Sequence, residues 1–235
     1  MKYVRGIFVT GTDTGVGKTV VATALVHLLA QGEVRVAGLK PVASGAERTP
    51  DGLRNADALA LAAESSVKLP YELTNPYCFE PAIAPHVAAA EAGVTIEVAC
   101  LVDWYHAATN QCDIAVVEGA GGWRVPLHPE GFLSDLPEQL GLGVILVVGL
   151  RLGCLNHARL TLEAIERSGR SPFLGWVGNR IDPQFMRADE NLTSLHRLLG
   201  SPPLAVIPPF ADPGPARTAE YLNHPSLRAI LGVAL

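Results

Sequence analysis

The sequence predicts an α/β fold in which a mostly parallel central sheet carries helices on both faces. Three observations lead to this prediction. Strand-length apolar segments alternate along the 235 residues with longer segments whose apolar residues recur at helical spacing. The strand segments are apolar almost without interruption, which is typical of parallel strands buried on both faces. A glycine-rich segment, GTDTGVGKT at residues 11–19, directly follows the first strand.

The expected elements follow one another in a regular order. Helices carry ordinary start and stop signals, such as the Asn55-x-Asp57 cap and the stop near Gly32. We expect strands at residues 3–10, 34–40, 113–122 (which runs into glycines), 143–149, 173–179 and 204–210. We expect helices at residues 18–32, 55–65, 94–111, 155–169 and 188–200, and a loop rich in proline, glycine and charge at 41–54. A single domain is expected to span 1–235, with a tail from about 211 that mixes prolines with a short helical piece.

The composition is that of a packed globular protein with an ordinary acidic surface. Apolar residues make up 49% of the chain and charged residues 17%, and the formal net charge is −5. The basic residues are scattered without a run, which argues against a nucleic-acid partner. No apolar run reaches the ~18 residues that span a membrane, and the first one is too short for a secretory signal. Four cysteines without metal-ligand spacing predict reduced thiols and a cytoplasmic location.

The chemistry-bearing residues gather where the expected strands end. Parallel sheets bind ligands at the carboxyl ends of their strands, because the loops that follow meet at one edge. Five loops with unusual residues fall at this edge, namely 11–19, 40–45, 118–124, 149–156 and 178–180. We therefore expect one large site that is built from several loops.

The segment at residues 11–19 reads as the phosphate loop of a P-loop NTPase-like fold with one extra residue. The usual spacing G-x-x-x-x-G-K-[ST] needs glycine at position 12, but glycine stands one residue earlier. In such a loop Lys18 reaches the β- and γ-phosphates and Thr19 holds Mg²⁺. A plain glycine turn is the alternative, but the strand before and the amphipathic helix after favour phosphate binding. The extra residue leaves residues 12–14 free to face a molecule beside the γ-phosphate.

Three further side chains at this edge indicate a site for an anionic reactant and a metal. Lys40 ends the second strand and would bring another positive charge to an anionic reactant, although a surface lysine before a proline is the alternative. Glu118 ends an apolar strand, where an acid is costly unless it meets a metal or a donor. Asp57 lies in the first turn of a helix, where a capping role is the alternative. Together with Thr19, the two acids fit a set of magnesium ligands.

Two more loops offer contacts of a different kind. Residues 154–156 open a helix directly after Gly153, where a carboxylate could dock on free N–H groups. A plain helix cap by Asn156 is the alternative. Asn179 ends another strand, and its amide has the groups needed to read an adenine edge, with an ordinary turn asparagine as the alternative.

Taken together, these segments resemble the dethiobiotin synthetase family. The resemblance rests on FVTGTDTGVGKT, GLKPVASG, LRNADALAL, NPYCFEPAIAPH, VVEGAGGW, VILVVGLRLGCLNHA and GWVGN, and runs from about residue 4 to 210. That family uses the spacing G-x-x-x-x-x-G-K-T, so the extra residue is a family feature. The segment PFADPGPARTAEY near the C-terminus matches poorly.

The resemblance implies an ATP-dependent cyclo-ligase of biotin synthesis that works as a homodimer. Its substrates would be diaminopelargonate, CO₂ and ATP with Mg²⁺, and its products dethiobiotin, ADP and phosphate. One amine would capture CO₂ as a carbamate, and the carbamate oxygen would attack the γ-phosphate to give a carbamic-phosphoric anhydride. The second amine would then close the ureido ring and expel phosphate. Phosphorylation is needed because a carbamate lacks a good leaving group, and positioning and electrostatics can supply most of the catalysis.

The resemblance also implies a role for each matching residue. Lys40 would be the active-site lysine, with Lys18 and Thr12 beside it at the reacting groups. The implied nucleotide contacts are Gly15, Val16, Gly17, Lys18, Thr19, Val20, Asp57, Glu118, Gly119, Ala120, Gly121, Asn179 and Pro208. The implied substrate contacts are Thr12, Ser44, Cys154 and Asn156, of which the last two would reach substrate bound mainly to the partner subunit. The implied magnesium ligands are Thr19, Asp57 and Glu118.

Two other classes of P-loop protein fit the sequence less well. A switch ATPase of the partition type carries Lys-Gly-Gly-x-Gly-Lys-Thr, but the position of its first lysine is Asp13 here. The loop at 40–45 also has no role in such a switch. An amidating synthase of the cobyrinic acid type needs a glutaminase module, for which 235 residues leave no room. The switch ATPase is kept as the alternative interpretation.

Overall fold

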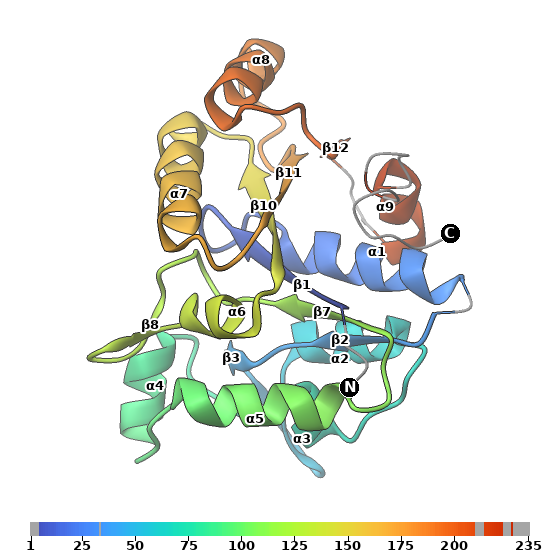
Figure 1. Ribbon diagram of the computed structural model, residues 1–235, viewed down its shortest axis with the longest axis vertical. Helices are drawn as coiled ribbons and strands as arrows, with labels where there is room; N and C mark the ends of the chain where they lie inside the picture. Colours follow the sequence, from blue (N-terminus) through green and yellow to red (C-terminus); the bar gives the residue numbers. More distant parts are fainter. Residues whose placement is uncertain (1–4, 33, 210–213, 223–226, 228–235) are drawn as a thin grey trace.

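A sheet of six parallel strands runs through the described part of the chain, in the order β12-β11-β10-β1-β7-β2 (Figure 1). The computed structural model describes all residues except 1–4, 33, 210–213, 223–226 and 228–235. The strands are β1 (Arg5–Gly11), β2 (Val36–Leu39), β7 (Ile114–Glu118), β10 (Gly143–Gly149), β11 (Phe173–Asn179) and β12 (Ala205–Ile207). The predicted parallel α/β architecture is confirmed.

Helices cover both faces of this sheet, and the side chains of β1 show how the two layers separate. Ile7 and Val9 pack with the apolar residues of α1, whereas Phe8 points to the other face and packs with those of α5. The first layer contains α1 (Lys18–Ala30), α2 (Ala56–Glu64) and α9 (Pro215–Leu222). The second contains α4 (Pro85–Glu91), α5 (Val98–Thr109), α6 (Asp135–Leu140), α7 (Cys154–Ser168) and α8 (Ala188–Leu199). Within the described residues, no helix combines the length and apolar character needed to cross a membrane.

The segment that follows β2 is more finely structured than the sequence predicts. Residues 41–54, expected as a loop, contain β3 (Val42–Ser44) and a hairpin of β4 (Glu47–Thr49) and β5 (Gly52–Arg54). Strand β3 pairs in parallel with β6 (Tyr77–Phe79), and the short helix α3 (Tyr71–Thr74) precedes β6. Three-residue strands carry too short a pattern for periodicity to reveal them. A second small hairpin, β8 (Pro126–His128) with β9 (Gly131–Phe132), was also not predicted from the sequence.

The other element boundaries agree with the sequence prediction to within a few residues, with one larger difference. The helix expected at 94–111 begins only at Val98. The residues before it, Val94 to Ile96, are all β-branched and remain extended or irregular, because such side chains lose rotamer freedom in a helix. Helix α9 confirms the short helical piece in the tail, while residues 3–4, 210 and much of the tail after 222 lie outside the described residues.

Candidate active site

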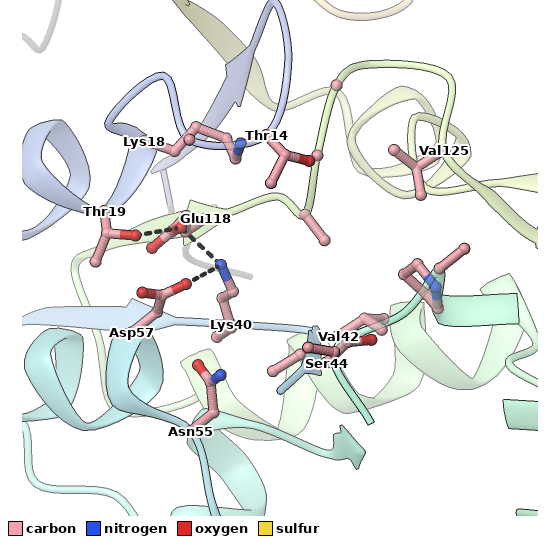
Figure 2. Close-up of a pocket in the computed structure, with 18 of the residues that line it drawn as sticks. Thr14, Lys18, Thr19, Lys40, Val42, Ser44, Asn55, Asp57, Glu118 and Val125 are labelled. Carbon is pink, nitrogen blue, oxygen red and sulfur yellow. Dashed lines mark hydrogen bonds and ion pairs between the residues drawn. The ribbon is translucent and has the colours of Figure 1, made fainter. Parts of the chain in front are cut away.

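A cavity of about 820 Å³ opens at the carboxyl edge of the central sheet (Figure 2). Its walls come from the loop between β1 and α1, the segment from β2 to β3, the start of α2, the residues before α4 and the loop after β7. Three of the five predicted loops, 11–19, 40–45 and 118–124, therefore meet around one space. The volume is in the range of cavities that hold a cofactor or a drug-sized ligand.

The phosphate loop forms one wall of this cavity. Gly15 and Gly17 have φ angles of 73° and 90°, a left-handed conformation that glycine adopts without strain. Helix α1 begins at Lys18, so the N–H groups of its first turn face the cavity edge as an anion site. The Lys18 ammonium donates to the carbonyl of Asp13 at 2.9 Å. Burial, with a smaller contribution from the nearby Lys40 ammonium, lowers the pKa of Lys18 to about 8.

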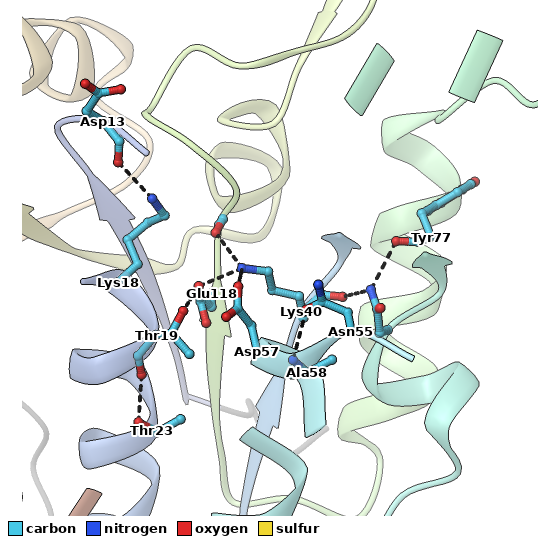
Figure 3. Close-up of polar contacts among 12 residues, drawn as sticks. Asp13, Lys18, Thr19, Thr23, Lys40, Asn55, Asp57, Ala58, Tyr77 and Glu118 are labelled. Atoms are coloured by element: carbon cyan, nitrogen blue, oxygen red, sulfur yellow. Dashed lines mark hydrogen bonds and ion pairs between the residues drawn. The ribbon is translucent and has the colours of Figure 1, made fainter. Parts of the chain in front are cut away.

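Lys40 joins the phosphate-loop wall to the opposite wall (Figure 3). Its Nζ lies 2.6 Å from Glu118 Oε1 and 2.9 Å from Asp57 Oδ2, and it also donates to the carbonyl of Gly119 at 3.3 Å. Burial alone would lower the pKa of Lys40, but the two carboxylates together hold it above its ordinary value. Burial raises the pKa of Glu118, whereas Lys40 lowers that of the more exposed Asp57. The lysine is therefore a buried ammonium group paired with two carboxylates.

The oxygen atoms around Lys40 fit a magnesium ion. The Thr19 hydroxyl donates to Glu118 Oε1 at 2.8 Å, which brings it next to the two carboxylates. The second carboxylate oxygen of Glu118, Oε2, is buried and meets no hydrogen-bond partner among the described residues. A hydroxyl and two carboxylates are hard oxygen donors, and Mg²⁺ usually takes one or two carboxylates together with phosphate oxygens. The donor set matches that preference.

A polar network behind Lys40 was missed by the sequence analysis. Asn75 is buried and donates to the carbonyls of Lys40 at 2.7 Å and Tyr77 at 3.1 Å. Its Oδ1 accepts from the Tyr71 hydroxyl at 3.1 Å, which in turn accepts from the backbone N–H of Asn55 at 2.7 Å. Burial raises the pKa of Tyr71 to about 12, so its hydroxyl keeps the proton that it donates. The only sequence signal for this network was the Asn55 helix cap, which the structure confirms.

Most of the predicted site residues lie in the cavity wall, and of residues 12–14 it is Thr14 that lines it. Those that line it are Gly15, Gly17, Lys18, Thr19, Val20, Lys40, Ser44, Asp57, Glu118, Ala120 and Gly121. Thr14 lines the wall in the place expected for Thr12, which is tied through its N–H to Val147 O at 3.0 Å. Val16 is fully buried in the core beneath the loop.

The remaining predicted residues lie outside the cavity wall. Asn179 is buried and donates its Nδ2 to the carbonyl of Val16 at 3.0 Å, so the amide nitrogen braces the phosphate loop. Pro208 follows β12. Cys154 is buried and Asn156 is exposed at the start of α7, and neither contributes to the wall. Their contacts with adenine and substrate stay predictions.

The fold and the phosphate loop define the chain as a P-loop NTPase. Residues 5–217 match a family model described as an AAA domain. A ParA family ATPase from Chlorobium tepidum superposes with a TM-score of 0.57 at 17% identity, covering 97% of this chain and 98% of that one. The MinC:MinD complex from Aquifex aeolicus gives a TM-score of 0.60 at 16% identity, covering 98% and 97%. Both likenesses concern the fold alone.

Sequence comparison places the chain within this class. The ATP-dependent dethiobiotin synthetase BioD of Pseudomonas paraeruginosa is 52% identical over 217 residues, 92% of this chain and 95% of that protein. The BioD proteins of Chromohalobacter salexigens and Aromatoleum aromaticum are 50% and 47% identical and cover 93% and 94% of this chain and 97% and 98% of their own lengths. The chain belongs to the ATP-dependent dethiobiotin synthetase family.

Proposed function

We propose that the protein is an ATP-dependent ligase that converts diaminopelargonate and CO₂ to dethiobiotin, with ADP and phosphate as the other products. The observation that carries the proposal is the position of Lys40. Its ammonium lies in the same cavity as a phosphate loop but on the opposite wall, where a reactant beside the γ-phosphate would meet it. Membership in the dethiobiotin synthetase family supports the assignment of that reactant.

The proposed reaction has three steps. One amine of the substrate attacks CO₂, and loss of a proton leaves a carbamate. A carbamate oxygen then attacks the γ-phosphorus, the bond to the bridging oxygen breaks, and ADP leaves. The second amine attacks the carbamate carbon, the C–O bond to the phosphate breaks, and phosphate departs as the ring closes. The protein contributes by holding the two reactants in line and by matching the negative charge on the transferred group.

Each wall of the cavity supplies part of the positive charge that matches the transferred group. Lys18 leaves the Asp13 carbonyl to meet the phosphates, and the first turn of α1 adds its N–H groups. Lys40 meets the carbamate and the transferred phosphoryl group from the other side. Thr19, Asp57 and Glu118 would hold Mg²⁺, which neutralises phosphate charge when bound.

The test is a mass-resolved product analysis. Diaminopelargonate, bicarbonate and MgATP incubated with the protein should yield dethiobiotin, with phosphate released only when both the diamine and bicarbonate are present. Phosphate release at the same rate without the diamine would contradict the proposal. That result would favour a P-loop ATPase switch. The likenesses to ParA and MinD are not evidence for such a switch, because they concern the fold alone.

We further propose that the protein works as a homodimer in the cytoplasm. Asn156 is exposed at the start of α7, next to Leu152, which is 92% exposed, and neither lines the cavity of its own chain. This agrees with a contact across a two-fold interface. All four cysteines are free thiols, as in a reducing compartment. Sedimentation analysis should give a dimer, and a fully active monomer would contradict this part of the proposal.

A further inference from the structure

Asn55 presents a hydrogen-bond donor to the active-site cavity that has no role so far. Its side chain is only 6% exposed yet lines the cavity wall, where it lies below Asp57 and Lys40 in Figure 2. As the N-cap of α2, its Oδ1 accepts a hydrogen bond from Ala58 N–H at 3.2 Å. Because an N–H can only donate, the amide oxygen must face the helix, and Nδ2 is left on the cavity side. Nδ2 meets no acceptor among the described residues.

The position of Asn55 is fixed relative to Lys40. Its carbonyl accepts from Leu59 N–H at 3.0 Å within α2, and its N–H donates to the Tyr71 hydroxyl at 2.7 Å. Tyr71 is hydrogen-bonded to Asn75, whose amide donates to the carbonyl of Lys40. One network therefore holds both backbones, so the free donor of Asn55 and the Lys40 ammonium are presented together. Such preorganisation is typical of groups that bind a reactant.

The chemistry of the wall narrows what the donor can bind. An amide nitrogen needs an acceptor oxygen, which excludes the protonated amines of a diamine. Phosphate oxygens have their own partners at the phosphate-loop wall, namely Lys18 and the start of α1. On the side of Asn55, Ser44 also has a buried hydroxyl without a partner among the described residues. Two unused polar groups beside a lysine fit a small anionic group with two oxygens.

We propose that Asn55 is a further substrate-binding residue, whose Nδ2 donates to an oxygen of the carbamate formed on the diamine. This inference rests on the proposed function, because a carbamate arises only in that reaction. The donor orients the carbamate so that its other oxygen points at the γ-phosphate. The neutral amide of Asn55 then positions the carbamate oxygens, and the Lys40 ammonium supplies the positive charge that balances the carbamate.

Two substitutions separate this role from the helix cap. Asn55→Ser and Asn55→Asp both keep an oxygen that can accept from Ala58 N–H, but neither keeps the amide Nδ2 that donates into the cavity. The serine variant adds no charge, and the aspartate variant preserves the shape. Asn55→Ala loses the cap and the donor together and serves as the matched control. A melting temperature near that of the wild type in the first two variants, and a lower one in the third, shows that the cap is retained.

Kinetics and a direct view of the carbamate complete the experiment. In both cap-retaining variants, kcat/KM for the diamine should fall by roughly 10- to 100-fold, as for loss of a hydrogen bond to a charged group, while ADP affinity stays within about twofold. With ¹³C-bicarbonate and diamine but no nucleotide, ¹³C NMR should show an enzyme-bound carbamate in the wild type and a weakened signal in the variants. Unchanged kinetics and an unchanged signal, or an equal loss of ADP affinity, would overturn the assignment of Asn55. A wild type that forms no dethiobiotin would instead overturn the proposed function, so the two failures are distinguishable.

Discussion

The two walls of the active site are built by different means. The phosphate-loop wall lies between the buried strand β1 and helix α1, and its shape comes from backbone conformation supported by the apolar core. The opposite wall combines the short segment from β2 to β3 with the start of α2, and hydrogen bonds with polar side chains of the α3–β6 segment behind it hold it in place. One wall therefore depends on where glycine is allowed, and the other on which hydrogen bonds are made. Lys40 is where the two walls meet.

The largest effect is expected from breaking this junction with Lys40→Met. The substitution leaves Glu118, which is 1% exposed, without its counter-charge, so we expect a loss of about 3 kcal/mol in unfolding free energy. Turnover should fall by roughly 100- to 1,000-fold, because the charge that faces the transferred group is gone. Chemical denaturation and steady-state phosphate release measure the two effects.

The double variant Lys40→Met/Glu118→Gln is the control for this prediction. Removal of the second charge should restore much of the stability, while turnover stays low. A single variant as stable as the wild type, or a double variant with recovered turnover, would show that the Lys40–Glu118 pair does not join the walls as described.

A smaller effect should distinguish two glycines within the phosphate loop. Gly17→Ala and Gly15→Ala both force a left-handed conformation on alanine, which costs about 1–2 kcal/mol. A Cβ on Gly17 would also lie 2.1 Å from Asn179 Nδ2, whereas one on Gly15 would have no atom within 4 Å. The Gly17 variant must therefore displace Asn179 and break its bond to the Val16 carbonyl, for a further cost of about 1 kcal/mol or more. Urea denaturation of both variants measures the difference, and equal losses would mean that Asn179 does not brace the loop.

The same contrast explains how much the sequence could predict. The strands, α1 and the phosphate loop follow from long apolar runs and from a glycine spacing that needs particular backbone angles, so they were found to within a few residues. Lys40 was found because it ends a strand at the ligand-binding edge, and Glu118 because an acid at the end of a buried strand needs a metal or a donor. Both signals are local in the sequence.

The network around Tyr71 and Asn75 could not be found in this way. Each of its hydrogen bonds joins segments that only the fold brings together, and a buried asparagine or tyrosine leaves no periodic pattern in the sequence. For a related reason, the sequence left open which of residues 12–14 faces the cavity. The conformation of the lengthened phosphate loop decides which threonine faces the cavity, and the sequence alone does not specify that conformation.

The smallest effects should separate the polar contacts directly behind the opposite wall from an exposed ion pair outside it. Tyr71→Phe removes a half-buried hydroxyl that accepts from Asn55 and donates to Asn75, and should cost about 1 kcal/mol of unfolding free energy. It should also raise KM for the diamine a few-fold, because the same hydroxyl positions the wall beside Lys40.

Arg48→Ala is the matched control in β4, outside the cavity wall. Its ion pair with Glu80 is as short, at 2.6 Å, as the hydrogen bonds of Tyr71, but the two side chains are 72% and 52% exposed. Because solvent screens the attraction, we expect the unfolding free energy to change by no more than about 0.5 kcal/mol. Thermal denaturation and diamine kinetics of the two variants test the contrast. If Arg48→Ala costs more than Tyr71→Phe, the network around Tyr71 and Asn75 is not what holds the opposite wall in place. The position of Lys40 would then need another explanation, because Asn75 is the only described side chain that hydrogen-bonds its carbonyl.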